Sequence, residues 1–219
     1  ESPRGSGEGK AMRSFLLAAS AMLLIGGCAS MNEDQCRAGD WGSQGYRDGL
    51  RGFPTTRLDA HARACGKYGI APEPAPYQSA REDGLRGYCR FERGFDAGRR
   101  GESYHGVCRP GEEFAFLPAY RDGLRLHAAE AALETARSDL DRAVSWIRDR
   151  EDKLDAKQRE LGEDGKTDAE KEQIRSRIRE VRGELREARV RARDAERALD
   201  WAEDEADRVR FDLSGRYPV

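Results

Sequence analysis

Four cysteines in the middle of the chain are the side chains best suited to covalent or metal chemistry. They are Cys36, Cys65, Cys89 and Cys108. Zinc sites typically draw thiolates from pairs about two to four residues apart. These cysteines are 29, 24 and 19 residues apart, which argues against zinc. A thiolate of Cys108 beside His105 would be a candidate nucleophile. An even number of cysteines also fits two disulfides, which would remove both alternatives.

Acid–base chemistry would depend on two aspartates and a histidine in the same stretch. Asp48, Asp83 and His61 could supply the general acid and base of a cell-wall hydrolase. The two aspartates, however, belong to an internal repeat, and nothing singles out a catalytic pair. We therefore expect no catalytic residue, no metal site and no cofactor, and we expect His61 to make a structural hydrogen bond.

An eight-residue pattern occurs four times and predicts short helices that pack closely. It reads GYRDGLRG from Gly45, AREDGLRG from Ala80, GFDAGRRG from Gly94 and AYRDGLRL from Ala119. Small residues at positions one and five share one helix face, where another backbone can approach. Interior glycine costs about 0.5–1 kcal/mol relative to alanine, so the fifth-position glycines are assigned to close packing. These are Gly49, Gly84, Gly98 and Gly123. The last glycine of the first three copies predicts a helix C-terminus.

The chain opens with a segment typical of a secretory signal peptide. Arg13 precedes 14 uncharged residues, Ser14–Gly27, which are too few for a membrane-spanning helix of about 20. The sequence LIGGC, which ends at Cys28, resembles the lipobox of bacterial lipoproteins. The resemblance implies cleavage before Cys28 and acylation of Cys28, which would anchor the protein stably. Because Ala29 follows rather than aspartate, it also implies the outer membrane of a Gram-negative cell. Residues 12–27 are then the signal peptide, and residues 1–11 an upstream extension or fragment.

Export to an oxidising compartment favours disulfides for the other four cysteines. Three pairings are open, and we favour Cys36–Cys65 with Cys89–Cys108 because it joins neighbouring elements. Each bridge would contribute about 2–4 kcal/mol, a large share of what so small an apolar core can supply.

An ordered series of glycine, aromatic and cysteine residues runs from Met31 to Leu126. It includes DQCRAGDW from Asp34, the glycines of the repeat, His61 with Cys65, GYC from Gly87 and YHGVC from Tyr104. The series resembles an uncharacterised family of bacterial lipoproteins that has a cysteine-containing domain of unknown function. The resemblance implies no activity, substrate or cofactor. We expect residues 28–118 to form this glycine- and cysteine-rich helical domain.

Heptad spacing predicts an antiparallel coiled-coil hairpin over residues 119–213. Leucine or isoleucine recurs every seventh residue from Leu126 to Leu161, and a second apolar series begins at Ile174. Thr167 and Glu170 form the pattern of a capping box, so the helices should span about 118–161 and 168–213. Core residues should pair so that Leu154 lies against Val181 and Leu133 against Ala202. Residues 214–219 are expected to be a tail.

Three large aromatic residues lie off the apolar seam of the hairpin. Trp146, Trp201 and Phe211 could pack against the N-terminal domain or form a surface for a partner. Charged blocks such as residues 175–193 mix arginine with glutamate, which is typical of a solvated, ion-paired helix face.

Composition excludes some classes of function. The net charge is -2, from 39 basic and 41 acidic residues, so there is no electrostatic basis for binding nucleic acid. We expect an all-α, lipid-anchored envelope protein with a structural or protein-interaction role in the periplasm. A peptidoglycan-binding module is the first alternative and a cell-wall hydrolase the second. The expected partners are the membrane, through lipid on Cys28, and an envelope protein or peptidoglycan.

Overall fold

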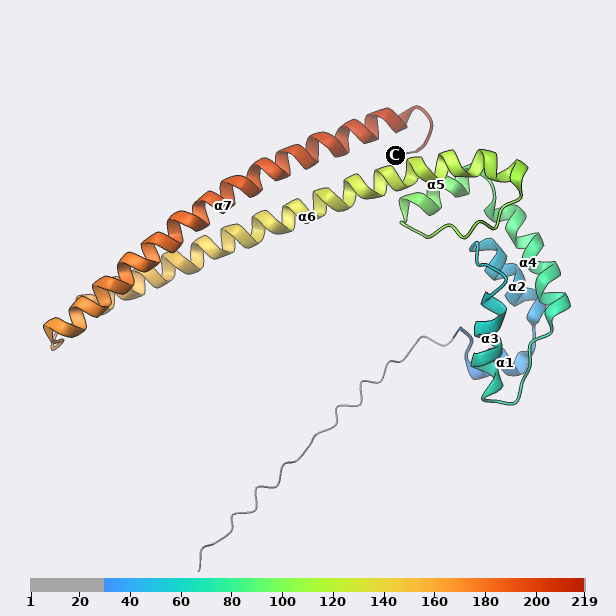
Figure 1. The fold of residues 1–219 in the computed structure, drawn as a ribbon, viewed down its shortest axis with the longest axis horizontal. Helices are drawn as coiled ribbons and strands as arrows, with labels where there is room; N and C mark the ends of the chain where they lie inside the picture. Colours follow the sequence, from blue (N-terminus) through green and yellow to red (C-terminus); the bar gives the residue numbers. More distant parts are fainter. Residues whose placement is uncertain (1–29, 219) are drawn as a thin grey trace, which may run out of the picture.

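The computed structural model describes residues 30–218, which form seven helices and no strand. In chain order these are α1 (Glu33–Ala38), α2 (Trp41–Leu50), α3 (Arg57–Gly66), α4 (Pro74–Tyr88), α5 (Phe91–Arg99), α6 (Pro110–Leu161) and α7 (Asp168–Ser214). Helices α1–α5 and the start of α6 make a domain at one end, and the rest of α6 extends from it with α7 as a long arm (Figure 1). The all-α fold with a long hairpin is the one that the sequence predicts.

Short, well-capped helices begin the domain. Asn32 forms a capping box with Gln35 at the start of α1, and the Asp40 side chain accepts a hydrogen bond from the Ser43 backbone N–H at the start of α2. Both caps satisfy backbone donors that a helix N-terminus leaves free. A disulfide between Cys36 and Cys65 joins α1 to α3, and Met31 is buried beside it.

Helices α2 and α4 pack so closely that only glycine fits between them. A methyl group on Gly49 would lie 2.2 Å from the carbonyl oxygen of Arg81, and one on Gly84 would lie 2.3 Å from that of Tyr46. Such distances are far inside van der Waals contact, so any side chain there would push the two backbones apart. The first and second copies of the repeat are therefore partners.

The third and fourth copies form a second pair, α5 with the start of α6, in the same way. A methyl group on Gly98 would lie 2.1 Å from the carbonyl oxygen of Tyr120, and one on Gly123 would lie 2.2 Å from that of Phe95. A second disulfide, Cys89–Cys108, accompanies this pair. The domain is thus built from two similar glycine-packed helix pairs, and both disulfides have the pairing that we favour from the sequence.

The final glycine of the repeat has two different roles. Gly52 and Gly101 adopt left-handed backbone angles, with φ of 69° and 67°, just after the ends of α2 and α5. Gly87 differs, because α4 continues through it to Tyr88. A methyl group there would lie 2.7 Å from the end of the Leu50 side chain, which would have to shift, so this glycine packs against α2 rather than ending a helix.

Helix α6 begins at Pro110, not near residue 118 as the sequence predicts. Proline is favourable at the first position of a helix, but Pro118 lies inside, where it typically costs about 3 kcal/mol. Phe116 and Ala119 flank Pro118 and are fully buried, so packing against α5 keeps this segment helical. One continuous helix therefore passes from the domain into the arm.

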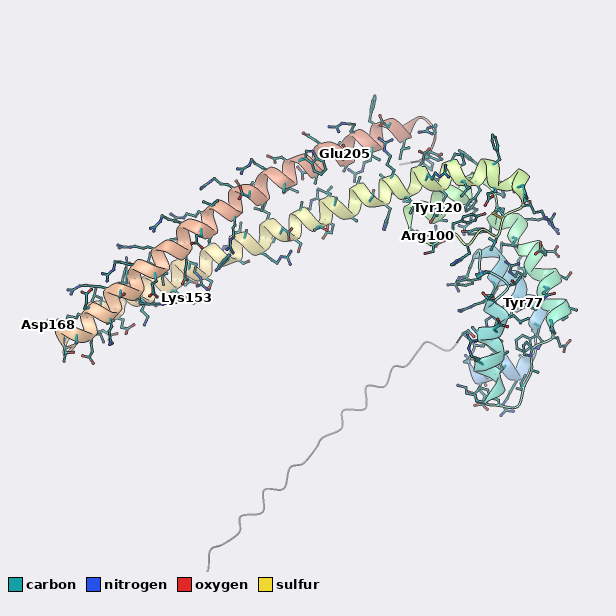
Figure 2. All side chains as sticks on the ribbon, in the orientation of Figure 1. Tyr77, Arg100, Tyr120, Lys153, Asp168 and Glu205 are labelled. Atoms are coloured by element: carbon teal, nitrogen blue, oxygen red, sulfur yellow. A yellow bond between two sulfur atoms is a disulfide. The ribbon has the colours of Figure 1, made fainter. Side chains whose placement is uncertain are left out.

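The arm is an antiparallel hairpin with a thin apolar core. Near the domain its core includes Leu126, Leu133, Ala202 and Val209, which agrees with the predicted pairing of Leu133 with Ala202. Thr167 and Glu170 form the predicted capping box at the start of α7. Charged side chains line the outer faces of both helices (Figure 2), and Arg189 pairs across the hairpin with Glu151 at 2.9 Å.

The C-terminal residues are more than a tail. Tyr217 is buried, and its ring stacks on Phe95 of α5 with 3.9 Å between the ring centroids. The Tyr217 hydroxyl donates a hydrogen bond of 2.9 Å to Asp122, and Arg216 forms an ion pair with the same carboxylate. The end of α7 is thereby fastened to the second helix pair.

Candidate functional site

Four buried polar side chains from α2, α3 and α4 form a cluster centred on His61, which the partly buried Ser30 joins. The His61 Nε2 atom is 2.6 Å from Asp48 Oδ2, and its Nδ1 atom is 2.9 Å from the Ser30 hydroxyl. Tyr77 lies on α4 (Figure 2). Its hydroxyl group donates a hydrogen bond of 2.9 Å to the same Asp48 oxygen. Gln44 donates from its amide nitrogen to the other oxygen of Asp48 at 3.1 Å. We call these five residues the His61 cluster.

Burial makes the electrostatics of this cluster strong. His61 is fully buried and Asp48 is 2% exposed. Burial by itself raises the pKa of Asp48, but hydrogen bonds from His61, Tyr77 and Gln44 outweigh it, so the pKa lies below its usual value. Burial and the bond to Asp48 raise the pKa of Tyr77 well above its usual value. Asp48 is therefore the negative charge of the cluster.

The second helix pair lacks this cluster although it has the same glycines. Ala97 occupies the repeat position of Asp48. Phe116 packs against Gly94 in the way that Tyr77 packs against Gly45. Backbone packing by itself therefore does not require the aspartate or the tyrosine hydroxyl. The polar groups are a specific addition to the first pair, and the sequence singled out His61 and Asp48 but not Ser30, Gln44 or Tyr77.

A pocket of about 430 Å³ opens beside the His61 cluster. Its lining includes Ser30, Gln44, Asp48, Arg47, Arg51 and Arg57. The guanidinium groups of Arg51 and Arg57 lie 4.7 and 4.6 Å from the centroid of the Phe53 ring. Arg47 donates to the Gln44 side-chain oxygen at 2.8 Å. We call this the arginine pocket.

The chain Ser30–His61–Asp48 contains the three side-chain types of a serine nucleophile, its base and an orienting carboxylate. With Nε2–H assigned as the donor to Asp48, Nδ1 of a neutral imidazole accepts the Ser30 hydroxyl proton. Serine hydrolases usually present Nε2 to the serine and Nδ1–H to the carboxylate, so the order of the two nitrogens is reversed here. The geometry also fits a simpler role, because Ser30 and the buried Met31 hold the start of the domain against α3.

The other predicted site residues lie apart from this cluster. Asp83 is on the exposed face of α4, where it forms an ion pair with Arg86. Cys36, Cys65, Cys89 and Cys108 are all in disulfides, so Cys108 offers no thiolate to His105 and none of these four supplies a thiolate to zinc. Within residues 30–218 no group of three or more metal-ligating side chains comes together. Cys28 lies outside the described residues, two positions before Ser30.

The three aromatic residues of the arm differ from one another. Trp146 is half-buried, with the Arg191 guanidinium 4.3 Å from its ring centroid, so it packs within the hairpin. Trp201 and Phe211 are 66% and 81% exposed and do not pack against the domain. Trp201 borders an open apolar pocket of about 260 Å³ that Ala128, Ala132 and Val209 also line. Phe114, near the start of α6, is 85% exposed and was not singled out from the sequence.

Fold and site together define a class of protein: a disulfide-bonded helical domain with two glycine-packed helix pairs, a polar cluster in one of them, and a coiled-coil arm. Residues 40–125, which include both pairs, match the family described as "Protein of unknown function (DUF2799)". Searches of curated proteins and of solved structures found no match. In the part of the chain from residue 30 to 218, no helix has the length and apolar character needed to cross a membrane.

Proposed function

We propose that this chain is a lipid-anchored envelope protein whose domain lies against the outer membrane and whose arm presents a surface to a partner in the periplasm. The observation that carries the proposal is the continuity of α6, which passes from the second helix pair into the hairpin. At about 1.5 Å per residue its 52 residues extend for roughly 80 Å. A partner bound along the arm would therefore be held at a defined place relative to the domain.

The contacts of Ser30 and Met31, the first described residues after Cys28, support the same proposal. Ser30 is hydrogen-bonded to His61, and Met31 is 2% exposed in the core beside the Cys36–Cys65 disulfide. Only Ala29 separates Cys28 from these held residues. A long flexible linker would let the domain move away from its anchor, but here lipid on Cys28 would hold the domain directly at the bilayer surface.

Two measurements test the anchoring. Cells that express the full chain are fed a labelled fatty acid, and the chain is compared with its Cys28→Ser variant. We expect label and outer-membrane fractionation in the parent and neither in the variant. Cys36→Ser with Cys65→Ser is the control, because it removes two other sulfurs but leaves the acyl acceptor. A Cys28→Ser product that stays labelled would refute the proposal.

Site-specific photocrosslinking tests the role of the arm. A crosslinking residue is placed at Trp201 and at Phe211, which are exposed on α7, and at the exposed Arg63 of the domain as the control. We expect one envelope protein to be captured from both arm positions and not from Arg63. Absence of any common product from the arm would contradict the interaction role.

A second candidate function, hydrolysis through a serine nucleophile, is favoured by one observation, the Ser30–His61–Asp48 chain. Ser30 would lose its proton to His61, and Asp48 would stabilise the resulting imidazolium. A fluorophosphonate probe reacts with activated serines. It should then label Ser30 in the protein with both disulfides formed. Labelling should be lost in Ser30→Ala and retained in Ser43→Ala, whose serine lies at the exposed start of α2. An unlabelled parent protein would exclude this function.

A further inference from the structure

The arginine pocket gathers three positive charges, none of which is in direct ion-pair contact with a carboxylate of residues 30–218. Within residues 30–218, Arg47, Arg51 and Arg57 form no ion pair. Arginines elsewhere on the domain do: Arg37 pairs with Glu33 at 2.6 Å, and Arg86 pairs with Asp83. Three guanidinium groups around one pocket repel one another in the absence of a counter-charge. An anion in the pocket would relieve this repulsion.

The guanidinium groups are held in place rather than free to disperse. Arg51 and Arg57 both lie against the ring of Phe53, and Arg47 is held by its bond to Gln44. The Nε atom of Arg57 is buried and has no hydrogen-bond acceptor among residues 30–218. A buried donor without an acceptor is costly and uncommon in folded proteins. The atom has almost no solvent-accessible surface, so it adds to the positive charge of the pocket wall rather than offering a direct contact to a ligand.

The one carboxylate in the pocket lining, Asp48, already accepts hydrogen bonds from other residues. Both oxygens of Asp48 accept hydrogen bonds within the His61 cluster, and its side chain is 3% exposed. Asp48 therefore does not pair with the arginines, although its charge does reduce the positive potential of the pocket. The excess of positive charge lies at the pocket opening, where Arg47 and Arg51 are exposed.

The pocket also lies close to the anchoring residue. Ser30 is part of its lining, and Cys28 precedes Ser30 by two residues. An extended chain spans at most about 3.3–3.6 Å per residue, so the two-residue step from Ser30 back to Cys28 leaves little room between an anchor and this wall. If Cys28 carries lipid, as proposed above, then this side of the domain faces the headgroup layer of the bilayer.

We propose that the arginine pocket binds the phosphate of an anionic phospholipid headgroup in the leaflet that holds the anchor. Guanidinium groups donate paired hydrogen bonds that match phosphate oxygens, and they carry their charge at any physiological pH. The pocket adds a second contact to the lipid on Cys28, so the domain is oriented on the membrane as well as tethered to it. The proposal rests on the anchoring for this orientation but not for the binding itself.

Vesicle co-sedimentation tests the binding without the anchor. The mature chain with Cys28→Ser, produced without the signal peptide of residues 12–27 and with both disulfides formed, is mixed with vesicles of phosphatidylcholine alone or of phosphatidylcholine with phosphatidylglycerol. We expect binding only to the vesicles with phosphatidylglycerol, and weaker binding at high salt. Arg51→Gln with Arg57→Gln should lower the affinity by about tenfold to thirtyfold, because each basic residue near an anionic surface contributes comparably.

Three controls keep the result interpretable. Arg63→Gln removes the same charge from an exposed position of α3 outside the pocket and should leave the affinity within about twofold. Arg47→Gln keeps both arginines that lie on Phe53, so it tests the pocket even if the double variant unfolds, and it should lower the affinity by about fivefold. Binding of inorganic phosphate, measured by titration calorimetry, shows whether the pocket takes a free anion or requires a lipid headgroup.

The outcomes separate this proposal from the anchoring. Equal losses in the Arg63 and pocket variants would overturn it, as would binding to phosphatidylcholine alone. Binding of inorganic phosphate without binding to phosphatidylglycerol vesicles would overturn the headgroup assignment. Failure of fatty-acid labelling at Cys28 would refute the anchor and leave the vesicle result intact.

Discussion

The domain and the arm hold their helices together in opposite ways. In the domain, helices meet backbone to backbone at a few glycines, with two disulfides and a buried polar cluster close by. In the arm, two long helices meet through repeated layers of leucine, isoleucine, valine and alanine, with ion pairs along the outside. The domain therefore concentrates its stability in a small number of positions, whereas the arm distributes it along its length. Substitutions of one type should have different effects in the two regions.

Glycine replacement should produce the largest contrast. Gly49→Ala would place a methyl group 2.2 Å from the Arg81 carbonyl oxygen, and we expect it to destabilise the domain by about 3 kcal/mol or more. Gly183 lies inside α7, where a methyl group would meet only the flexible end of Arg186 at 3.8 Å. Gly183→Ala should therefore stabilise the arm by about 0.5–1 kcal/mol. Urea unfolding, monitored by hydrogen exchange of amides in α2 and α7, measures the free energy of unfolding of the domain and of the arm. Similar losses of stability in the two variants would refute the contrast.

Disulfide removal should come next in size. Cys89→Ser with Cys108→Ser releases the loop beside the second helix pair and should cost the domain about 2–4 kcal/mol. We expect amides of α5 to lose protection from hydrogen exchange while those around Val181, far along the arm, keep theirs. Equal loss of protection at Val181 would show that the arm depends on the domain for its stability.

The His61 cluster should make the first helix pair sensitive to acid. Because the pKa of Asp48 is lower in the folded protein than its usual value, the charged carboxylate stabilises the fold at neutral pH. That contribution is lost as pH falls from about 4 through the folded pKa. Asp48→Asn should lower the free energy of unfolding by about 1–3 kcal/mol at neutral pH. In a plot of this free energy against pH, the variant should also show a smaller decrease below about pH 4 (the acid limb) than the parent.

Asp83→Asn is the matched control for this prediction, since Asp83 is an exposed aspartate in the equivalent part of the second repeat copy. It should change the stability at neutral pH by no more than about 0.5 kcal/mol. An Asp48→Asn variant with the acid limb of the parent would show that Asp48 is not the group that titrates.

Ion pairs on the arm should have the smallest effect. Arg189 and Glu151 are about half exposed, so solvent screens their attraction. Arg189→Ala should change the stability of the arm by no more than about 0.5 kcal/mol. A loss above about 1 kcal/mol in thermal unfolding would mean that charge pairs, rather than apolar layers, hold the hairpin together.

Local patterns in the sequence were sufficient to predict much of this molecule. The heptad spacing predicts both arm helices and their pairing, because a helix has 3.6 residues per turn wherever it lies. Thr167 and Glu170 mark the start of α7 for a similarly local reason. The repeat predicts close helix packing at Gly49 and Gly98, which the structure confirms.

Tertiary structure decided which elements meet. A stripe of small residues shows that a helix can be approached closely, but not by which helix, and only the fold pairs the first copy with the second and the third with the fourth. The same is true of the His61 cluster, whose members are distant in sequence, and of the helical start of α6, where burial of Phe116 and Ala119 outweighs the penalty of Pro118. Helical periodicity is a property of neighbouring residues, whereas these contacts depend on the packing of the whole chain.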